Sequence, residues 1–304
     1  MATSLKGRNF RILIYDSVAD KFSCIGMATS CTVNLINNTE NSETKDDTGL
    51  ASKPTMVSQG WNVSVESLSV TDVGSLLTAI KSFTPFTLLW DETDTDNNQT
   101  ALGETFARQG QAYLSDFTAT FNNRENSVKN LQFQGTGELT YAGTTIETAV
   151  LSAGSYTKGQ YVRLFLSSNN TLTPSLVIAA ARQLSLHVSL SLQDATTKDT
   201  QGTWVVQEPT ALSYDISTTA LVRSAETITS QTGGQGMAEV EAIWQGGSPV
   251  KWEIANANGS NQRTKGAVIV SGSALITNMS INGPMGTADY TAQLQGYGDY
   301  TVAA

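Results

Sequence analysis

The octapeptide of residues 133–140 reads Phe133-Gln134-Gly135-Thr136-Gly137-Glu138-Leu139-Thr140, and it returns at residues 294–301 as Leu294-Gln295-Gly296-Tyr297-Gly298-Asp299-Tyr300-Thr301. Each copy holds two glycines, two positions apart, inside a run that reads as a strand. Glycine within a strand marks a bulge or a close approach of two backbones. We therefore predict that both stretches share the same bend.

Further matches occur in the same order through both halves of the chain. They are Lys6-Gly7 with Lys158-Gly159, Thr44-Lys45-Asp46 with Thr197-Lys198-Asp199, Leu89-Trp90 with Ile243-Trp244, and Gly110 with Gly266. The separation grows from 152 residues at the first pair to 161 at Gln134 and Gln295. Such a period is far longer than the roughly 20–50 residues of solenoid repeats. The sequence therefore predicts a duplicated domain, with residues 1–145 and 157–304 joined by a linker of residues 146–156.

The composition and the hydrophobic pattern predict a mainly β protein. Only 15% of the residues are charged, and Ser, Thr, Asn, Gln and Gly are abundant, which is typical of strands with polar outer faces joined by turns. Alternation of apolar and polar residues is clearest from Leu184 to Leu192. We expect two tandem β-sandwich or small barrel domains, each with one flanking α-helix.

One helix is predicted in each half. In the first half, Val73, Leu76, Leu77 and Ile80 recur at helical spacing after Thr71-Asp72, which can cap a helix. In the second half, the less regular stretch from Thr219 to Ile228 takes the corresponding place. Residues 240–244 are then read as the strand that follows it.

Residues 38–60 are almost wholly polar and follow neither the strand nor the helix period. They predict a long loop or an extended arm. Loops above about 12–15 residues within compact domains are usually functional, so this segment is a candidate contact surface.

Charge and cysteine content exclude several classes of protein. The net charge of −9 argues against a protein that grips nucleic acid, since phosphate binding needs Lys and Arg. No stretch approaches the roughly 20 apolar residues of a membrane helix, and the N-terminus does not read as a signal peptide, so we expect a cytoplasmic product. Cys24 and Cys31 lie seven residues apart and would face opposite sides of a straight strand, so we expect no disulfide.

No catalytic, cofactor or metal site is expected. His187 is the single histidine, and it lies in an alternating strand on the face opposite Leu186 and Val188, an ordinary place for a polar residue. The acidic run from Asp91 to Asp96 lacks the glycine and glutamate spacing of an EF-hand, so it is interpreted as a surface loop. These residues offer no visible geometry for an enzyme.

Taken in order, these features make the chain resemble the major tail tube proteins of long-tailed bacteriophages. The similarity rests on Lys6-Gly7 and the strand after it, the Thr44-Lys45-Asp46 loop, Gly60-Trp61 with its alternating strand, the helix after Asp72, the Gly110-x-Ala112 strand, and the closing Phe133-x-Gly135-x-Gly137 strand. It covers residues 5–141, and residues 157–302 through the repeat. The second copy departs from the pattern because no Gly-Trp pair precedes its strand.

The resemblance implies a structural subunit without enzymatic activity. In that family the sheets of neighbouring domains join into one barrel around a lumen, with six domains to a ring. Chains of two domains would then form trimeric, pseudo-hexameric rings, and the rings would stack into a hollow tube that conducts viral DNA. The implied location is the tail of the virion, assembled in the cytoplasm of the bacterial host. The implied partners are the tape measure protein in the lumen, the terminator and the distal tail protein, with double-stranded DNA in passage.

Two sets of residues are assigned on this basis. The segment from Asn38 to Gln59, with Gln193 to Gln207 as its counterpart, is expected to make the ring-to-ring contact. Its charged candidates are Glu40, Glu43, Lys45, Asp46, Asp47, Lys53, Lys198 and Asp199. The candidates for lining the lumen, where carboxylates would repel the DNA backbone, are Asp116, Glu138 and Asp299.

Two other interpretations remain open at this point. A distal-tail or tail-terminator protein shares the fold, although such relatives tend to carry extra domains or to stop at a single copy. A two-domain β-sandwich binding module is the other, and exposed aromatic clusters on one face would favour it; the spacing of the aromatic residues indicates none.

Overall fold

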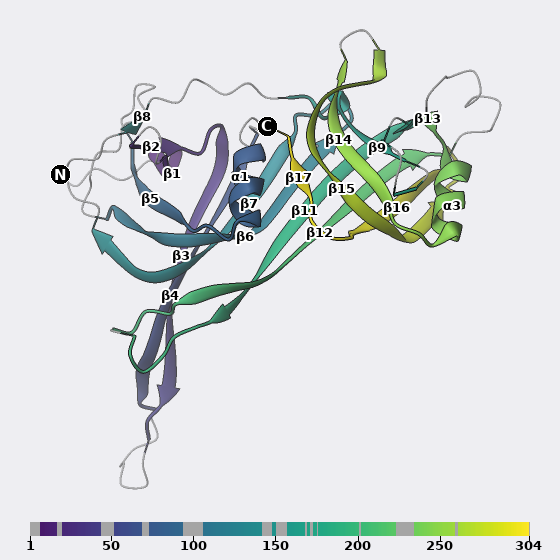
Figure 1. The fold of residues 1–304 in the computed structure, drawn as a ribbon. Helices are drawn as coiled ribbons and strands as arrows, with labels where there is room; N and C mark the ends of the chain where they lie inside the picture. Colours follow the sequence, from purple (N-terminus) through teal and green to yellow (C-terminus); the bar gives the residue numbers. More distant parts are fainter. Residues whose placement is uncertain are drawn as a thin grey trace.

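The computed structural model consists almost entirely of β-strands. It describes residues 7–16, 20–43, 52–68, 73–93, 106–141, 148–149, 157–167, 169–170, 173–174, 176–200, 202–222, 234–258 and 261–303. The strands in these ranges form one hydrogen-bonded system, and two described α-helices lie against it (Figure 1). The prediction of a mainly β fold is confirmed.

The first half carries one α-helix between its fourth and fifth strands. Its elements are η1 (Gly7–Asn9), β1 (Phe10–Asp16), β2 (Lys21–Cys24), β3 (Ala28–Asn41), β4 (Pro54–Ser67), α1 (Val73–Lys81), β5 (Phe86–Glu92), β6 (Arg108–Asn122), β7 (Val128–Tyr141) and β8 (Thr148–Ala149).

The second half runs in a similar order. Its elements are η2 (Gly159–Tyr161), β9 (Val162–Leu166), β10 (Leu176–Ile178), β11 (Ala181–Asp194), β12 (Gln207–Leu221), β13 (Gly234–Gln235), α3 (Met237–Gly246), β14 (Val250–Asn258), β15 (Asn261–Asn282), β16 (Asp289–Gly296) and β17 (Thr301–Val302).

The pairing pattern of the first half recurs in the second. β1 pairs with β2 and β5, β5 with β6, β6 with β7, β7 with β4, and β4 with β3. Correspondingly, β9 pairs with β10 and β14, β14 with β15, β15 with β16, β16 with β12, and β12 with β11. An irregularity recurs too, because the β3–β4 ladder shifts register after Ala28 and the β11–β12 ladder shifts after Ala181.

Most buried apolar side chains of both halves form one continuous cluster, and a small separate cluster lies in each half, around Leu13 and Leu89 in the first and around Phe165 and Val177 in the second. α1 contributes Val73, Leu76, Leu77 and Ile80, all at most 3% exposed, as their spacing predicts. α1 lies in the middle of the molecule beside β17, whereas α3 lies at the outer end of the second half (Figure 1). Helices of this kind gain their stability chiefly by burying one apolar face against a sheet.

The helix of the second half lies elsewhere than predicted. Thr219 belongs to the end of β12, and residues 240–244 lie in α3 rather than in a strand. Residues 222–236 connect β12 to α3, whereas residues 68–72 suffice between β4 and α1. The match of Trp90 with Trp244 is therefore wrong, because the strand that pairs as β5 does is β14. The rest of the predicted helix, residues 223–228, lies outside the described residues.

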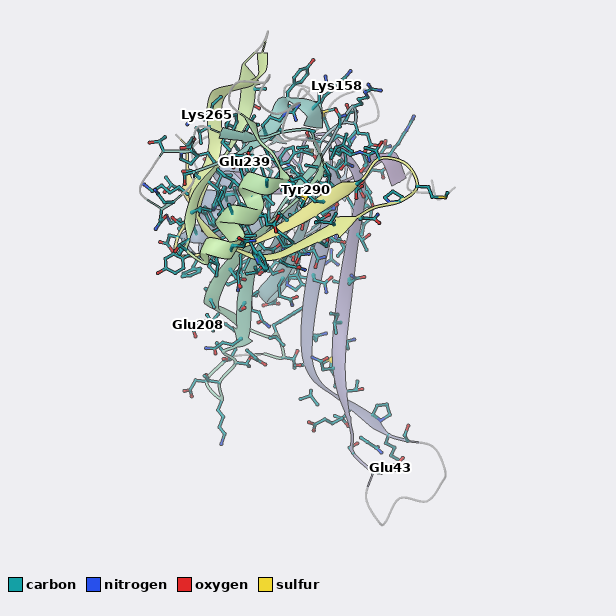
Figure 2. All side chains as sticks on the ribbon, turned by 90° about the vertical axis from the view of Figure 1, so that its right-hand side faces the viewer. Glu43, Lys158, Glu208, Glu239, Lys265 and Tyr290 are labelled. Carbon is teal, nitrogen blue, oxygen red and sulfur yellow. The ribbon has the colours of Figure 1, made fainter. Side chains whose placement is uncertain are left out.

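The polar segment of residues 38–60 is largely a β-hairpin arm, so the long-loop alternative is wrong and the extended arm is confirmed. β3 and β4 stay paired from Asn37 opposite Gln59 to Asn41 opposite Pro54. The Asn38 amide donates to the Ser58 hydroxyl at 2.8 Å across the arm. Because the arm projects from the body with both faces in solvent (Figure 2), polar side chains suit both faces and the period-2 signal is lost.

Two smaller expectations can also be compared with the structure. Cys24 and Cys31 are not joined by a disulfide, as their spacing predicts. Asp91, expected in a surface loop, instead lies in β5, fully buried and opposite Arg11. Neither described helix is long and apolar enough to cross a membrane.

Candidate functional site

The two halves meet in a ladder between β6 and β11, which we call the internal junction. Residues 116–122 of β6 pair antiparallel with residues 183–189 of β11. On the core side Phe117 lies opposite Val188 and Ala119 lies opposite Leu186, and all four side chains are at most 2% exposed. The junction therefore continues one sheet through the molecule, in the strand order β3, β4, β7, β6, β11, β12, β16, β15.

His187 bridges three strands on the opposite face of the internal junction. Its Nε2 lies 2.7 Å from Asp116 Oδ2 on β6, and its Nδ1 lies 2.8 Å from Asp215 Oδ1 on β12. The partners of this histidine come from strands far apart in the sequence, so spacing alone did not reveal them. Both ring nitrogens are therefore engaged by carboxylates.

The surroundings of His187 favour its protonated form. Partial burial acts to lower the pKa of the imidazole, but the hydrogen bonds and charges of Asp116 and Asp215 outweigh it and raise the pKa above the ordinary value. The protonated imidazole donates to both carboxylates at once, so it ties β6 to β12 across β11.

The glycines of the repeated octapeptide make room for an aromatic ring in the first half. A Cβ on Gly135 would lie 2.2 Å from the Trp61 ring, and one on Gly110 would lie 2.7 Å from it. Gly137 follows with φ of +73°, a left-handed conformation that favours glycine. The Trp61 indole nitrogen donates to the Gly137 carbonyl oxygen at 3.3 Å.

The second half has the same arrangement with other rings. A Cβ on Gly296 would lie 2.6 Å from the Tyr214 ring, and Gly298 also has φ of +73°. The shared bend predicted for the two octapeptides is therefore confirmed. A Cβ on Gly272 would lie 3.0 Å from Trp252 and 3.0 Å from Tyr214. The residue that matches Gly110 is therefore Gly272, and the predicted match with Gly266 is wrong.

The sheet presents a mainly polar face on the side away from the core, which also includes Tyr113, opposite Gln134, and Leu275, opposite Gln295. Directly opposed residues in antiparallel strands share a face, and the ladders bring the following residues onto it: Asn62, Ser64, Glu66, Asp116, Thr118, Asn130, Gln132, Ser185, His187, Ser189, Ser213, Asp215, Ser217, Asn278, Gln293 and Gln295. None of these residues is buried, and none is lysine or arginine. The face is hollowed over the second half, where a volume of about 570 Å³ is lined in part by Asp215, Gln295 and Asp299.

The three lumen candidates differ in position. Asp116 lies on the polar face and is bound to His187. Glu138 and Asp299 follow the two left-handed glycines, and both are exposed. Asp299 lies 3.9 Å from the Lys81 ammonium group, a loose and exposed ion pair.

The ring-stacking candidates within the described residues lie on two hairpins that project from the same side of the body (Figure 2). Glu40, Glu43 and Lys53 are exposed near the end of the longer β3–β4 arm, where the Ser42 N–H donates to the Lys53 carbonyl oxygen at 3.0 Å. Lys45, Asp46 and Asp47 lie outside the described residues. Lys198 and Asp199 are exposed in the turn that joins β11 to β12.

Part of the predicted stacking counterpart, Gln193 to Gln207, contacts its own chain instead. The Gln59 N–H donates to the Thr203 carbonyl oxygen at 2.7 Å, and the Val205 N–H donates to the Gln59 carbonyl oxygen at 2.8 Å. The shorter hairpin is thereby fastened to β4 of the first half, and its turn remains exposed.

The sheet ends in two open edges. Among the described strands, β3 pairs with β4 alone. Residues 276–282 of β15 pair with β16 on one side and with no described strand on the other. Leu35 on the first edge is 67% exposed, and Ile281 on the second is 59% exposed.

Comparison with known proteins gave similar structures but no related sequence. No family model matches the chain, and no curated protein matches it. One similar solved structure is the tail of an empty gene transfer agent particle computed with helical refinement and C6 symmetry, with 18% identity, a TM-score of 0.36, and coverage of 49% of this chain and 99% of that one. Another is the virion of a native gene transfer agent particle, with 18% identity, a TM-score of 0.34 and the same coverage.

Proposed function

We propose that the protein is the tube subunit of a phage-like tail, in which three chains form a ring and rings stack into a hollow tube. The observation that carries the proposal is the internal junction. It shows one half of the chain extending the sheet of the other, while both ends of the resulting sheet stay open. A sheet that extends itself once with these strands has the surfaces to do so again between molecules.

The proposal treats the chain as two copies of one tube domain. The recurrence of the strand pairing, of the register shifts and of the ring-on-glycine packing supports this duplication. With two domains in each chain, three chains supply the six domains of a ring, the number found in the family that the sequence resembles. Rings that stack head to tail make a contact that never closes, so they grow into a tube.

The polar face is proposed to line the lumen. Its amides, hydroxyls and carboxylates, with no lysine or arginine among the residues named above, offer no cation to neutralise phosphate, so double-stranded DNA would pass without binding. The tape measure, terminator and distal tail proteins are the proposed partners, and the virion tail is the proposed location. No enzymatic activity is proposed, since the one histidine has both ring nitrogens occupied by carboxylates.

The β3–β4 arm is proposed to make the ring-to-ring contact. Deleting residues 40–53 removes the projecting end of the arm and leaves the strands of the body intact. We expect this variant to stay folded and to form rings that do not stack. A variant whose rings still stack would contradict this assignment of the arm.

Electron microscopy of the purified protein, concentrated and left to assemble, tests the proposed function. Long hollow tubes with six density lobes in each ring are the expected result. Small closed oligomers at every concentration would favour a terminator or distal-tail protein, and persistent monomers would favour a binding module.

A further inference from the structure

We propose that chains join one another by repeating the internal junction, so that β15 of one chain pairs antiparallel with β3 of a second copy in one defined register. This inference rests on the proposed function, because it specifies the contact that closes the ring. We take the partner at each open edge to be a second copy of this chain. The β15 edge requires a strand like β3, the β3 edge requires a strand like β15, and each chain carries both strands at opposite ends of its sheet.

β15 holds the same position in the strand order of the second half as β6 holds in the first half. Ala274 pairs with Gly296 as Ala112 pairs with Gly135, and both ladders shift register two residues further along. The part of β6 that follows this shift forms the internal junction. The corresponding part of β15, residues 278–282, is an open edge.

β3 likewise holds the same position in the first half as β11 holds in the second half. Leu35 pairs with Trp61 as Val188 pairs with Tyr214, and both ladders contain the same irregularity near their start. Applying the register of the internal junction to the two open edges places Asn34 opposite Ser280 and Leu35 opposite Met279 of the second copy.

Apolar side chains are exposed at these two edges, whereas the side chains at the corresponding positions of the internal junction are buried. Leu35 is 67% exposed, whereas Val188 at the corresponding position is 1% exposed. Ile281 is 59% exposed, whereas Ala119 is fully buried. Pairing the edges would remove this apolar surface from water, which is the main driving force of association.

The polar face of the proposed joint carries amides in place of the histidine bridge. The Asn34 amide donates to Asn62 Oδ1 at 2.8 Å, and these residues hold the positions of His187 and Asp215. Asn278 of the second copy would hold the position of Asp116. Since an amide both donates and accepts, three asparagines can satisfy one another without a charge. The two kinds of junction would therefore alternate around the ring, one ionic and one neutral.

A glycine whose Cβ position meets no atom of the described residues supports the same contact. Gly159 is packed so closely on β6 that a Cβ would lie 2.4 Å from the Asn122 carbonyl oxygen, and its N–H donates to the Glu125 carbonyl oxygen at 2.9 Å. Gly7, its match in the repeated Lys-Gly pair, has no atom within 4 Å of the same position. We assign the missing neighbour to the turn of residues 283–288 in a second copy.

Trp244 supplies a further contact. The Tyr300 hydroxyl donates to the Leu77 carbonyl oxygen at 2.7 Å, so α1 is covered by the end of the second half. Trp244 and Ile80 each lie three residues before a left-handed residue that ends the helix, yet Ile80 is 2% exposed and Trp244 is 43% exposed. By the same correspondence, residues 139–141 of a second copy would cover α3.

Disulfide trapping tests the register. The variant with Asn34→Cys and Ser280→Cys places two thiols directly opposite each other, at the spacing a disulfide needs. The control with Thr32→Cys and Asn278→Cys uses equally exposed positions on the same edges, offset by four residues or about 13 Å. Both variants keep the natural cysteines, so those thiols contribute equally.

On oxidation of assembled protein, we expect the first variant to give linked dimers and trimers on a non-reducing gel and the control to stay monomeric. Tubes that form but cross-link only through the control pair, or through neither pair, would overturn this register and leave the tube proposal standing. Reduced protein of both variants that never assembles, with the unaltered chain also monomeric, would overturn both proposals.

The variant Gly7→Val tests the proposed contact between Gly7 and the turn of residues 283–288 of a second copy, and it needs no cross-link. Because an added Cβ on Gly7 would meet no atom of the described residues within 4 Å, the thermal unfolding of the monomer should not change. Overfilling a packed contact weakens it, so the concentration needed for ring formation should rise about tenfold or more. Unchanged assembly would overturn this part of the contact.

Discussion

The first and second halves pack the same glycines against different aromatic rings. In the first half the ring on the glycines is Trp61 on β4, with Trp90 on β5 beside it, whereas in the second half it is Tyr214 on β12, with Trp252 on β14 beside it. The strand position of Trp252, opposite Gly272, is held in the first half by Leu88, opposite Gly110. The close backbone approach at the glycines is therefore the constant feature, whereas the ring on the neighbouring strand differs between the halves by two residues along that strand, Trp90 against the position of Leu88.

The largest loss of stability is expected when a side chain is added at one of the closely packed glycines. Gly135→Ala places a methyl group 2.2 Å from the Trp61 ring, which is fully buried and has no room to withdraw. Urea unfolding should show a loss of about 3 kcal/mol or more. Gly60→Ala, with nothing within 4 Å, is the matched control and should stay within about 1 kcal/mol of the unaltered protein. Equal stability of the two variants would show that the ring yields at no cost.

A smaller loss of stability is expected when Trp252 is replaced by leucine, the residue at the corresponding position of the first half. Trp252→Leu introduces the side chain found at Leu88 but leaves Tyr214 unable to fill the volume that Trp61 fills. Since Trp252 is fully buried, unfolding should cost about 2–3 kcal/mol less than in the unaltered protein. The double variant with Tyr214→Trp should recover part of this loss. No recovery would mean that the two positions do not share one volume.

The hydroxyl of Tyr214 is expected to contribute about 1 kcal/mol. It donates to the Ser273 carbonyl oxygen at 2.5 Å, and Tyr214→Phe removes this hydrogen bond. The Ser273 oxygen still accepts the Tyr297 N–H at 2.8 Å, so the acceptor is not left unsatisfied. Tyr297→Phe, at a side chain that is 58% exposed, is the control and should leave the melting temperature unchanged.

The smallest effect is expected from the histidine bridge, and it depends on pH. The folded pKa of His187 is raised, so its contribution is complete below the unfolded pKa, about 6.5, and is lost as pH rises through the folded pKa. His187→Gln should therefore destabilise the protein more at pH 5.5 than at pH 8.5, by roughly 0.5–1 kcal/mol for a partly exposed pair. Asn34→His, facing Asn62 instead of a carboxylate, should introduce no such dependence. An equal pH dependence in both variants would contradict the bridge.

The features predicted correctly from the sequence depend on local patterns. The spacing of Val73, Leu76 and Leu77 gave α1, and the glycines at 137 and 298 gave the shared bend, because helix periodicity and backbone conformation are properties of a few neighbouring residues. The α3 helix was missed because the connection before it is long. The repeat was therefore aligned on Trp244, although the counterpart strand begins at Val250.

The candidate site was less accessible to sequence reasoning. Alternation from Leu184 to Leu192 predicted a strand and its two faces correctly, but it carried no information on the neighbouring strand. The bridge from Asp116 to His187 joins residues 71 positions apart, and the internal junction pairs residues from 61 positions apart, at Asn122 and Gln183, to 73, at Asp116 and Ser189. Only the correspondence of whole ladders, visible once the pairing is known, indicates which edges are equivalent.

The internal junction also bears on how fast a ring could appear. Because β6 and β11 belong to one polypeptide, half of the strand contacts in a ring of three would exist before two molecules meet. Tethered segments encounter each other at effective concentrations in roughly the millimolar range, far above those of separate subunits in a cell. Three bodies, not six, then lose their translational freedom when the first ring forms. Nucleation of the tube would accordingly have a lower kinetic order and a lower threshold concentration than for subunits with a single domain.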